Sequence, residues 1–361
     1  MTISIRVKRP LAAAATAALV LPLSVAAVAP AAGATVLVDR GWPPYPGSSG
    51  YVSLYATTSS LDTTEATDEQ SAGLVTITSE VEFGAGEAAG SGIVIGSDGL
   101  VVTNHHVVEG ATSIRVTVVT TGRTYDAEVL GTNAKRDVAV LRLEDASGLA
   151  TASTDVSGVA VGEDVTAVGD AGGDGGALTA AAGTVTDTNH PITVSDEQTG
   201  AAHRLTQLIE VDADIIPGDS GGALLEPDGD VVGMNVAASS GSANITGYVI
   251  PIKRVLRIAA HVVAGEETAS ITLGYDAFLG VSLAGTGTAL AGVVDGGAAA
   301  DAGLSAGDTI TSLGGTSVTT YVQLQKAVAA HDPGDSVRVT WTDASGASYS
   351  ATVTLGRAPV A

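Results

Sequence analysis

From Ser71 onward the chain is a succession of short apolar runs separated by glycine and aspartate, and this pattern limits the possible folds most strongly. Runs of this length, bounded by turn residues, are typical of a β-barrel or sandwich rather than of alternating strands and helices. With 46 glycines and only 3% aromatic residues, the core must be built mostly from small and medium aliphatic side chains. We therefore expect a mostly β protein with thin layers, with strands near 73–77, 91–95, 99–103, 113–119, 124–130, 137–143 and 164–168.

One segment in the second half has a clear helical pattern. Residues 252–263 place Val255, Ile258, Ala259 and Val262 on one face, and Gly265 follows the end. We expect this helix to close a first domain that covers residues 72–266. A second β-rich block runs from 271 to 357, with one helix-like interval at 321–330. Two domains suit a length of 361 residues.

The first 34 residues have the three-part form of an export signal. Arg6, Lys8 and Arg9 precede an apolar stretch over 11–28, and small residues follow at 32–34. This arrangement predicts a cleaved signal peptide and an exported protein, either extracellular or in the cell envelope. The alternative is an uncleaved segment that anchors the chain in the membrane.

Residues 35–71 are rich in Pro, Ser and Thr and predict an irregular arm. The arm contains Trp42, Tyr45, Tyr51 and Tyr55, which is more aromatic area than a solvated linker requires. These side chains would dock on a neighbouring subunit or on the arm's own domain, or the arm is only a spacer near the cell wall.

The charge balance excludes several classes of function. The chain has 39 acidic and 16 basic side chains and a net charge of -23, so it would repel phosphate backbones and no sequence-independent nucleic-acid binding is expected. Repeated apolar stretches of about 20 residues, which a membrane bundle needs, are absent from the sequence. Without cysteine, disulfides and thiolate metal sites are impossible. No ligand cluster or cofactor motif suggests a metal or a cofactor.

Three motifs contain residues for nucleophilic catalysis: Thr-Asn-His-His-Val-Val at 103–108, Asp-Val-Ala-Val-Leu-Arg-Leu at 137–143, and Pro-Gly-Asp-Ser-Gly-Gly-Ala at 217–223. A serine hydroxyl needs an imidazole to take its proton, and the imidazole needs a carboxylate that fixes its tautomer. Glycines beside the serine allow backbone N–H groups to approach a developing oxyanion.

In these motifs the chain resembles the HtrA/DegP-like branch of the trypsin-like serine proteases. The resemblance implies a double β-barrel, a catalytic set of His106, Asp137 and Ser220, and an oxyanion hole formed by the N–H groups of Gly218 and Ser220. It also implies unfolded or extended polypeptides as substrates. His105, the neighbour of His106, is expected to point the other way at the strand end.

Two residues depart from the HtrA pattern. Asp219 stands where these enzymes usually carry Asn, so a buried Asp219 would need an internal cation or hydrogen-bond donors. Asp214 stands where they usually carry a small apolar residue. If Asp214 faces the primary specificity pocket, cleavage should follow Lys or Arg. If it turns to solvent, Ile216 and Ala237 line the pocket and favour Val, Ala or Ile, which is the preference that we expect.

The second block resembles a PDZ domain. Phe278, Leu279, Gly280 and Val281 match the loop that binds a peptide's C-terminal carboxylate, and residues 299–310 match a pattern of protease-associated PDZ modules. The resemblance implies that the interval 321–330 is the helix beside the peptide groove, with Val322 or Lys326 near the ligand, and that the domain binds peptide C-termini by adding a strand.

The sequence thus predicts an exported HtrA-like serine endopeptidase with one PDZ domain. The resemblance further suggests that the aromatic arm assembles the chain into a homotrimer. The alternative function is a peptide-binding or chaperone-like module whose protease domain is latent or inactive.

Overall fold

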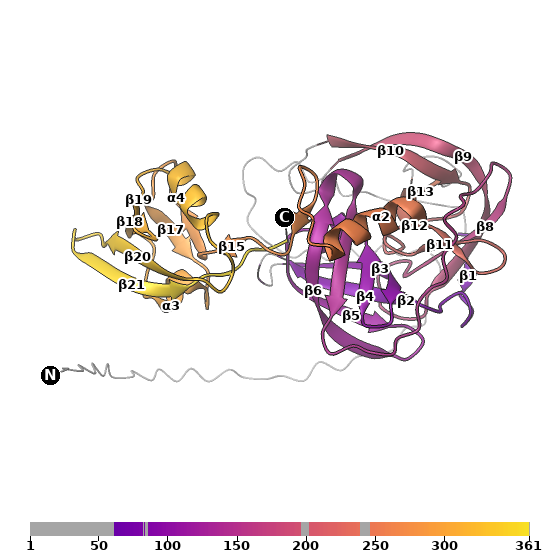
Figure 1. Ribbon diagram of the computed structural model, residues 1–361, viewed down its shortest axis with the longest axis horizontal. Coiled ribbons are helices and arrows are strands. Elements are labelled where there is room, and N and C mark those ends of the chain that lie inside the picture. Colours follow the sequence, from indigo (N-terminus) through magenta and orange to yellow (C-terminus); the bar gives the residue numbers. More distant parts are fainter. Residues whose placement is uncertain (1–60, 82, 84–85, 196–201, 239–245, 361) are drawn as a thin grey trace, which may run out of the picture. The chain divides into compact units, whose positions relative to one another are not determined.

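The computed structural model describes residues 61–81, 83, 86–195, 202–238 and 246–360 (Figure 1). The predicted signal peptide and the predicted arm up to residue 60, with its four aromatic side chains, lie outside these residues. The described chain is mostly β, as the sequence predicts, and contains two closed sheets followed by a smaller β-rich domain. No helix within this part of the chain is long and apolar enough to span a membrane.

The first sheet is a barrel. Its strand order is β14-β6-β5-β2-β3-β4-β7, and a further pairing between β6 and β7 closes it. Buried apolar and outward-facing polar residues alternate along its strands. In β5 the side chains of Ile114, Val116 and Val118 are buried, and the polar residues between them face outward. The elements of this barrel are β2 (Leu74–Val81), β3 (Gly86–Gly96), β4 (Leu100–Thr103), β5 (Ala111–Val118), β6 (Arg123–Asn133), β7 (Val138–Leu143) and β14 (Thr272–Leu273), with the short helices α1 (His105–Val108) and η1 (Ala134–Arg136).

The second sheet closes in the same way. Its order is β1-β9-β10-β13-β12-β11-β8, and β8 also pairs with β9. The outermost strand, β1, lies in the segment predicted as an irregular arm, where Thr64 pairs with Ala180 of β9. The strands are β1 (Thr64–Glu65), β8 (Asp164–Gly169), β9 (Thr179–Ser195), β10 (Ala202–Val211), β11 (Ala223–Leu225), β12 (Val231–Ala238) and β13 (Gly247–Pro251).

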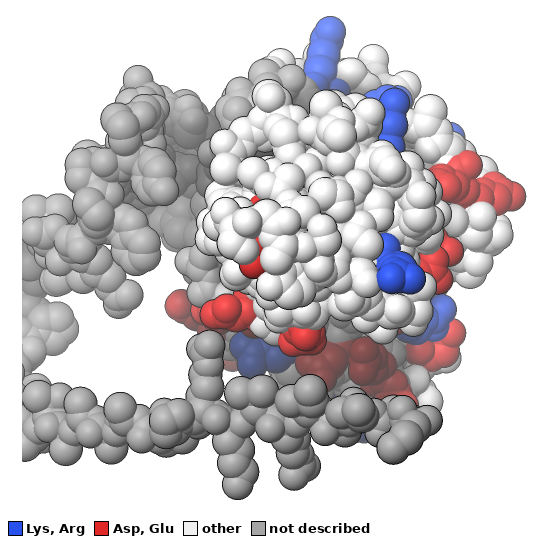
Figure 2. All heavy atoms as spheres, turned by 90° about the vertical axis from the view of Figure 1, so that its left-hand side faces the viewer, with Lys and Arg blue, Asp and Glu red and all other residues white. Residues whose placement is uncertain are grey.

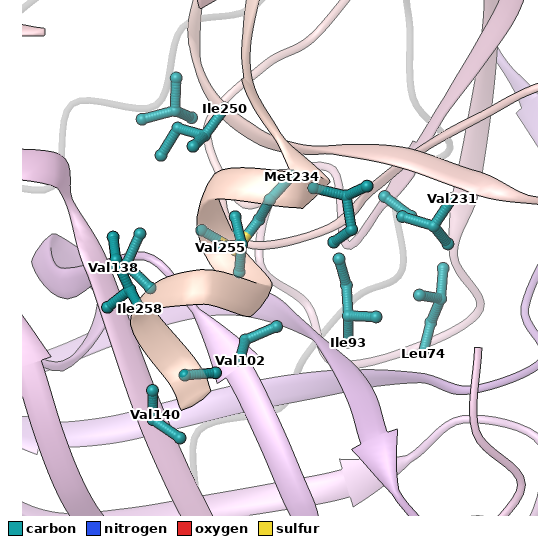
Figure 3. Close-up of a cluster of buried hydrophobic side chains, with 14 of the residues drawn as sticks. Leu74, Ile93, Val102, Val138, Val140, Val231, Met234, Ile250, Val255 and Ile258 are labelled. Carbon is teal, nitrogen blue, oxygen red and sulfur yellow. The ribbon is translucent and has the colours of Figure 1, made fainter. Parts of the chain in front are cut away.

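Helix α2 (Ile252–Val263) lies in a hydrophobic cluster to which both barrels contribute (Figure 3). Val255 and Ile258 pack among Val102 and Val140 of the first barrel and Met234 of the second. The helix has the predicted bounds, and it ends where Gly265 adopts a φ of 72°, a conformation that suits glycine. This shared cluster joins the two barrels, whose loops carry the candidate site.

The first sheet extends slightly beyond the predicted domain boundary. Thr272 of β14 pairs with Thr132 of β6, and Ile271 belongs to the cluster shared by the barrels. The smaller domain therefore begins after Leu273 in the structure. Its core is separate and includes Leu290, Ile310 and Trp341.

The smaller domain is a set of short sheets with two helices. Its largest sheet has the order β19-β18-β20-β21. Thr320 caps α4 by accepting a hydrogen bond from the Gln323 N–H, and α4 covers most of the helix predicted at 321–330. The elements are β15 (Ala277–Phe278), β16 (Val281–Leu283), β17 (Leu290–Val293), α3 (Ala298–Asp301), β18 (Thr309–Leu313), β19 (Thr316–Ser317), α4 (Tyr321–Val328), β20 (Ser336–Thr342), β21 (Ser348–Thr354) and β22 (Gly356–Arg357).

The described surface differs in charge from place to place. On the face shown in Figure 2, uncharged side chains cover most of the area, acidic side chains gather toward the lower and right-hand edges, and Lys and Arg stand apart from one another. This distribution agrees with the acidic composition of the chain.

Candidate active site

The two neighbouring histidines occupy different environments. Strand β4 ends at Thr103, and α1 begins at His105. His105 is 5% exposed, and its Nδ1 lies 4.0 Å from a Glu109 carboxylate oxygen. The His106 side chain is 45% exposed, and its Nδ1 lies 2.9 Å from Oδ2 of Asp137. Only the second histidine therefore combines access to solvent with a close carboxylate partner.

Asp137 is held at the junction between η1 and β7. The backbone of Asp137 is left-handed, with a φ of 55°, and this conformation turns its side chain toward α1. Strand β7 therefore begins at Val138, one residue after the predicted start. The carboxylate accepts hydrogen bonds from the His106 N–H (3.0 Å) and ring, and the Asn104 side-chain amide donates to the Asp137 carbonyl oxygen (3.0 Å).

The electrostatics of this pair fix the imidazole tautomer. Burial opposes the charge of Asp137, but the nearby His106 and its hydrogen bonds outweigh it and hold the carboxyl pKa below its ordinary value. A carboxylate only accepts hydrogen bonds, so Nδ1 of His106 carries the proton. Nε2 is then the unprotonated ring nitrogen, which is the one able to act as a base.

The loop that carries Ser220 is a tight turn that requires glycine at two positions. Gly218 and Gly221 have φ values of 100° and 85°. A Cβ at Gly218 would lie 2.1 Å from the Asp170 carbonyl oxygen, and one at Gly221 would lie 2.0 Å from the Ser91 carbonyl oxygen. Glycine is needed here both for backbone conformation and for close packing.

Ser91 of β3 connects this loop to the histidine segment. Its N–H donates to the Ser220 carbonyl oxygen (2.8 Å), and its hydroxyl donates to the Gly218 carbonyl oxygen (2.9 Å). The Thr103 hydroxyl, just before α1, donates to the Ser91 carbonyl oxygen (2.7 Å). Sequence analysis missed Ser91, and only its position between two glycines in a predicted strand hinted at a close approach.

The hydrogen bonds of the serine loop leave two donors available. Within the described residues, the N–H groups of Gly218 and Ser220 donate to no other group, while the Ser220 hydroxyl donates to the Val236 carbonyl oxygen (3.3 Å). The Gly218 carbonyl is turned away by its bond to Ser91. Such a pair of N–H groups beside a hydroxyl is able to bind an oxyanion.

Asp219 is buried at 4% exposure, directly before Ser220. Its Oδ2 accepts a hydrogen bond from the Ile216 N–H (2.9 Å). According to the sequence analysis, a buried Asp219 needs a cation or a hydrogen-bond donor, and the Ile216 N–H is such a donor. Burial, with a contribution from the charge of Asp170, raises the Asp219 pKa to about 7. Asp170 follows β8 and is also buried; sequence analysis did not single it out.

The residues predicted for the specificity pocket are only partly described. Asp214 is half-buried, and its Oδ2 accepts a hydrogen bond from the Asp62 N–H (2.8 Å) in the segment before β1. Ile216 is half-buried. The backbone of Ala237 pairs with Tyr248, and its side chain lies outside what the structure describes.

The predicted carboxylate-binding loop of the smaller domain joins β15 to β16. Gly280 has a φ of 77°, and the Leu279 and Gly280 carbonyl oxygens accept hydrogen bonds from the Ala299 and Val294 N–H groups (both 2.9 Å). Leu279 is buried, while Phe278 and Val281 are half-buried. On α4, Val322 is 53% exposed and Lys326 is also exposed.

No metal centre accompanies these residues. Among the residues that the structure describes, no group of three His, Asp or Glu side chains is arranged to hold a metal ion.

Comparison with known proteins gives matches to both predicted domains. A family model described as a trypsin-like peptidase domain matches residues 90–234, and a PDZ domain model matches residues 277–343.

The chain is 33% identical to serine protease PepD of Mycobacterium tuberculosis, over 77% of this chain and 63% of that protein. It is 33% identical to the serine protease Do-like HtrA of Lactococcus lactis, over 70% of this chain and 67% of that protein. It is 31% identical to the periplasmic serine endoprotease DegP of Escherichia coli, over 67% of this chain and 51% of that protein. The chain thus spans about half to two thirds of the length of these relatives.

Proposed function

Because the chain belongs to the HtrA-like family of serine proteases, we propose that it is a serine endopeptidase that hydrolyses unfolded or extended polypeptides. One observation supports the proposal most strongly: Nδ1 of His106 lies 2.9 Å from Oδ2 of the buried Asp137, so the ring proton belongs on Nδ1 and Nε2 is the basic nitrogen. The serine loop offers a hydroxyl beside two N–H groups that donate to no other described residue.

In the proposed mechanism, Asp137 fixes the ring of His106, and Nε2 takes the proton from the Ser220 hydroxyl. Ser220 attacks the carbonyl carbon of the scissile bond, and the N–H groups of Gly218 and Ser220 stabilise the oxyanion. His106 then gives its proton to the leaving amine. Water hydrolyses the acyl-enzyme with His106 again as the base. The 3.3 Å bond from Ser220 to Val236 must be exchanged when substrate binds.

We propose an apolar residue at the cleavage position. The Asp214 carboxylate already accepts a hydrogen bond from the backbone of Asp62, which supports an orientation outside the pocket. Sequencing of the cleavage sites in a digested unfolded protein tests this preference. We expect cuts after Val, Ala or Ile. A majority of cuts after Lys or Arg, lost in Asp214→Ala, would instead assign Asp214 to the pocket.

The smaller domain is proposed to bind peptide C-termini between β16 and α4. The glycine conformation at Gly280 and the engaged carbonyl groups of the loop support a carboxylate site formed by backbone N–H groups.

Export is proposed from the sequence of residues 1–34, and a homotrimer from the aromatic arm. Light scattering of the mature chain against one that begins near Ser71 tests the trimer; equal monomeric masses would refute it.

The proposed activity is tested by incubating the mature protein with an unfolded casein-type substrate. We expect hydrolysis that a serine-directed fluorophosphonate stops and that Ser220→Ala abolishes while the circular dichroism spectrum is unchanged. A folded wild-type protein that binds the substrate but never cleaves it would favour the chaperone-like alternative.

A further inference from the structure

Two buried carboxyl groups lie beside the serine loop and have no charged partner. Asp219 is 4% exposed and Asp170 is 3% exposed. Neither forms an ion pair with any residue that the structure describes. Burying an unpaired carboxylate costs several kcal/mol, so such groups usually become neutral.

The hydrogen bonds of Asp219 suit a protonated carboxyl group. Oδ2 accepts the Ile216 N–H, whereas Oδ1 is buried without any hydrogen-bond partner among the described residues. Oδ1 packs against Gly169, where an added Cβ would lie 2.7 Å away. A carboxylate oxygen in this position would lack the donors that stabilise negative charge. Protonation removes the charge, which costs more to bury than a neutral O–H group without a partner.

Among the described residues, the charged group that acts on the Asp219 pKa is Asp170, whereas the Ile216 N–H opposes its effect. Asp170 raises the Asp219 pKa, and the carboxylate of Asp170 is itself next to Asp174, with the Gly175 N–H as a donor to both of its oxygens (3.1 and 3.0 Å). The two remaining titratable groups of the site, His106 and Asp137, are bonded to each other through Nδ1 of the ring. Burial is the larger cause of the raised Asp219 pKa, which reaches about 7.

The same side chain holds the turn that shapes the site. The Asp219 N–H donates to the Ile216 carbonyl oxygen (3.0 Å), while the Ile216 N–H donates to the Asp219 side chain (2.9 Å). Gly218 lies inside this turn, and Ser220 follows it. If the carboxyl group left its buried position, the turn would lose one of its two hydrogen bonds, and the N–H groups of Gly218 and Ser220 would lose their common orientation.

We propose that Asp219 is a positioning residue that keeps the serine loop in its active conformation only while its carboxyl group is protonated. This inference rests on the proposed function. Ionisation leaves a buried carboxylate beside Asp170, and the strain is relieved when the side chain turns toward water and the loop opens. The peptidase then loses activity on the alkaline side through its serine loop.

The test is the pH dependence of kcat/KM, which reports ionisations of the free enzyme. For the wild type we expect a fall of about tenfold per pH unit above pH 7, as the protonated fraction declines. Asp219→Asn keeps the acceptor for the Ile216 N–H and cannot ionise, so its activity should persist and exceed that of the wild type about tenfold at pH 8. Asp170→Asn removes the neighbouring negative charge and should move the alkaline limb to lower pH.

Asp212→Asn is the matched control, because its carboxylate is exposed in the segment that leads into the same loop and binds Thr184. It should leave the pH profile of kcat/KM unchanged.

As a readout independent of activity, the carboxyl carbon of Asp219 in ¹³C-labelled Ser220→Ala protein should titrate near pH 7 in NMR spectra. If the wild type and Asp219→Asn hydrolyse the substrate with parallel pH profiles of kcat/KM, or if Asp219 titrates below pH 5, this inference is wrong while the proposed function stands. An absence of hydrolysis at every pH would refute the proposed function as well.

Discussion

At the scale of single residues, the adjacent histidines differ in exposure and in their carboxylate partner. His105 is 5% exposed, whereas the His106 side chain is 45% exposed and its Nδ1 lies 2.9 Å from Oδ2 of Asp137. We predict that His106→Ala lowers kcat/KM by at least about a thousandfold because the general base is lost. His105→Ala should stay within about tenfold, or about 1.4 kcal/mol of barrier.

The measurement is steady-state hydrolysis of an unfolded substrate, at a temperature where circular dichroism shows both variants folded. Because His105 is buried, its replacement is expected to cost stability, and the folded fraction serves as the control. A larger loss of activity in His105→Ala than in His106→Ala would contradict the assignment of the base.

The candidate catalytic residues could be proposed from the sequence, whereas the residues that support them in the structure could not. His106, Asp137 and Ser220 belong to short motifs that can be recognised without the fold. Ser91 binds Gly218, which is 127 positions away, and no local pattern encodes such a contact. The left-handed backbone of Asp137 also escaped sequence analysis, because the residue precedes a regular apolar alternation that resembles a strand start.

At the scale of elements, α2 is the clearest test of the shared core. Val255 is fully buried between the barrels, and Val263 at the end of the same helix is 54% exposed. Val255→Ala should lower the free energy of unfolding by about 2 kcal/mol, through lost burial and a small cavity. Val263→Ala makes the same change in helix propensity and should have an effect near zero.

Urea unfolding followed by circular dichroism measures both variants. Equal effects would show that the burial of Val255 contributes nothing beyond helix propensity, contrary to the core described here.

Elements with a strong local pattern were predictable, and those defined by distant pairing were not. The amphipathic period of α2 predicts its bounds. The long strands β9 and β10 were not predicted, because Gly183 and Pro191 interrupt the pattern and the register includes bulges near Leu208. Strand β14 pairs with β6, which lies far away in the sequence. For this reason the smaller domain begins after Leu273 and not at residue 271.

At the scale of the whole molecule, Asp219 makes stability depend on pH. The pKa of its carboxyl group is about 7 in the folded chain and 3.8 in the reference state. The folded state therefore holds the proton more tightly, and its contribution to stability is complete below pH 3.8 and lost as pH rises through 7. We predict that the free energy of unfolding of the wild type falls relative to Asp219→Asn by up to about 3 kcal/mol between pH 5 and pH 8.

Urea unfolding of both proteins at several pH values gives the difference, in which the effects of Asp137 and other shared groups cancel. A difference that does not change with pH would show that Asp219 is already ionised in the folded chain at pH 5.

The overall architecture was predictable from the sequence, because several specific motifs occur in one order along the chain and both domains match family models. The preferred residue at the cleavage position stays a prediction. The hydrogen bond from the Asp62 N–H to the Asp214 carboxylate, on which that prediction now rests, joins distant parts of the chain and has no local sequence pattern.

The most direct test of the central claim is covalent labelling of the purified protein with a fluorophosphonate, followed by peptide mapping with mass spectrometry. A serine activated by His106 reacts with this reagent, whereas an ordinary surface serine does not. We predict one adduct, on Ser220, that is absent in Ser220→Ala and strongly reduced in His106→Ala. A folded wild-type protein that remains unlabelled, or that carries the adduct on another serine, would contradict the account.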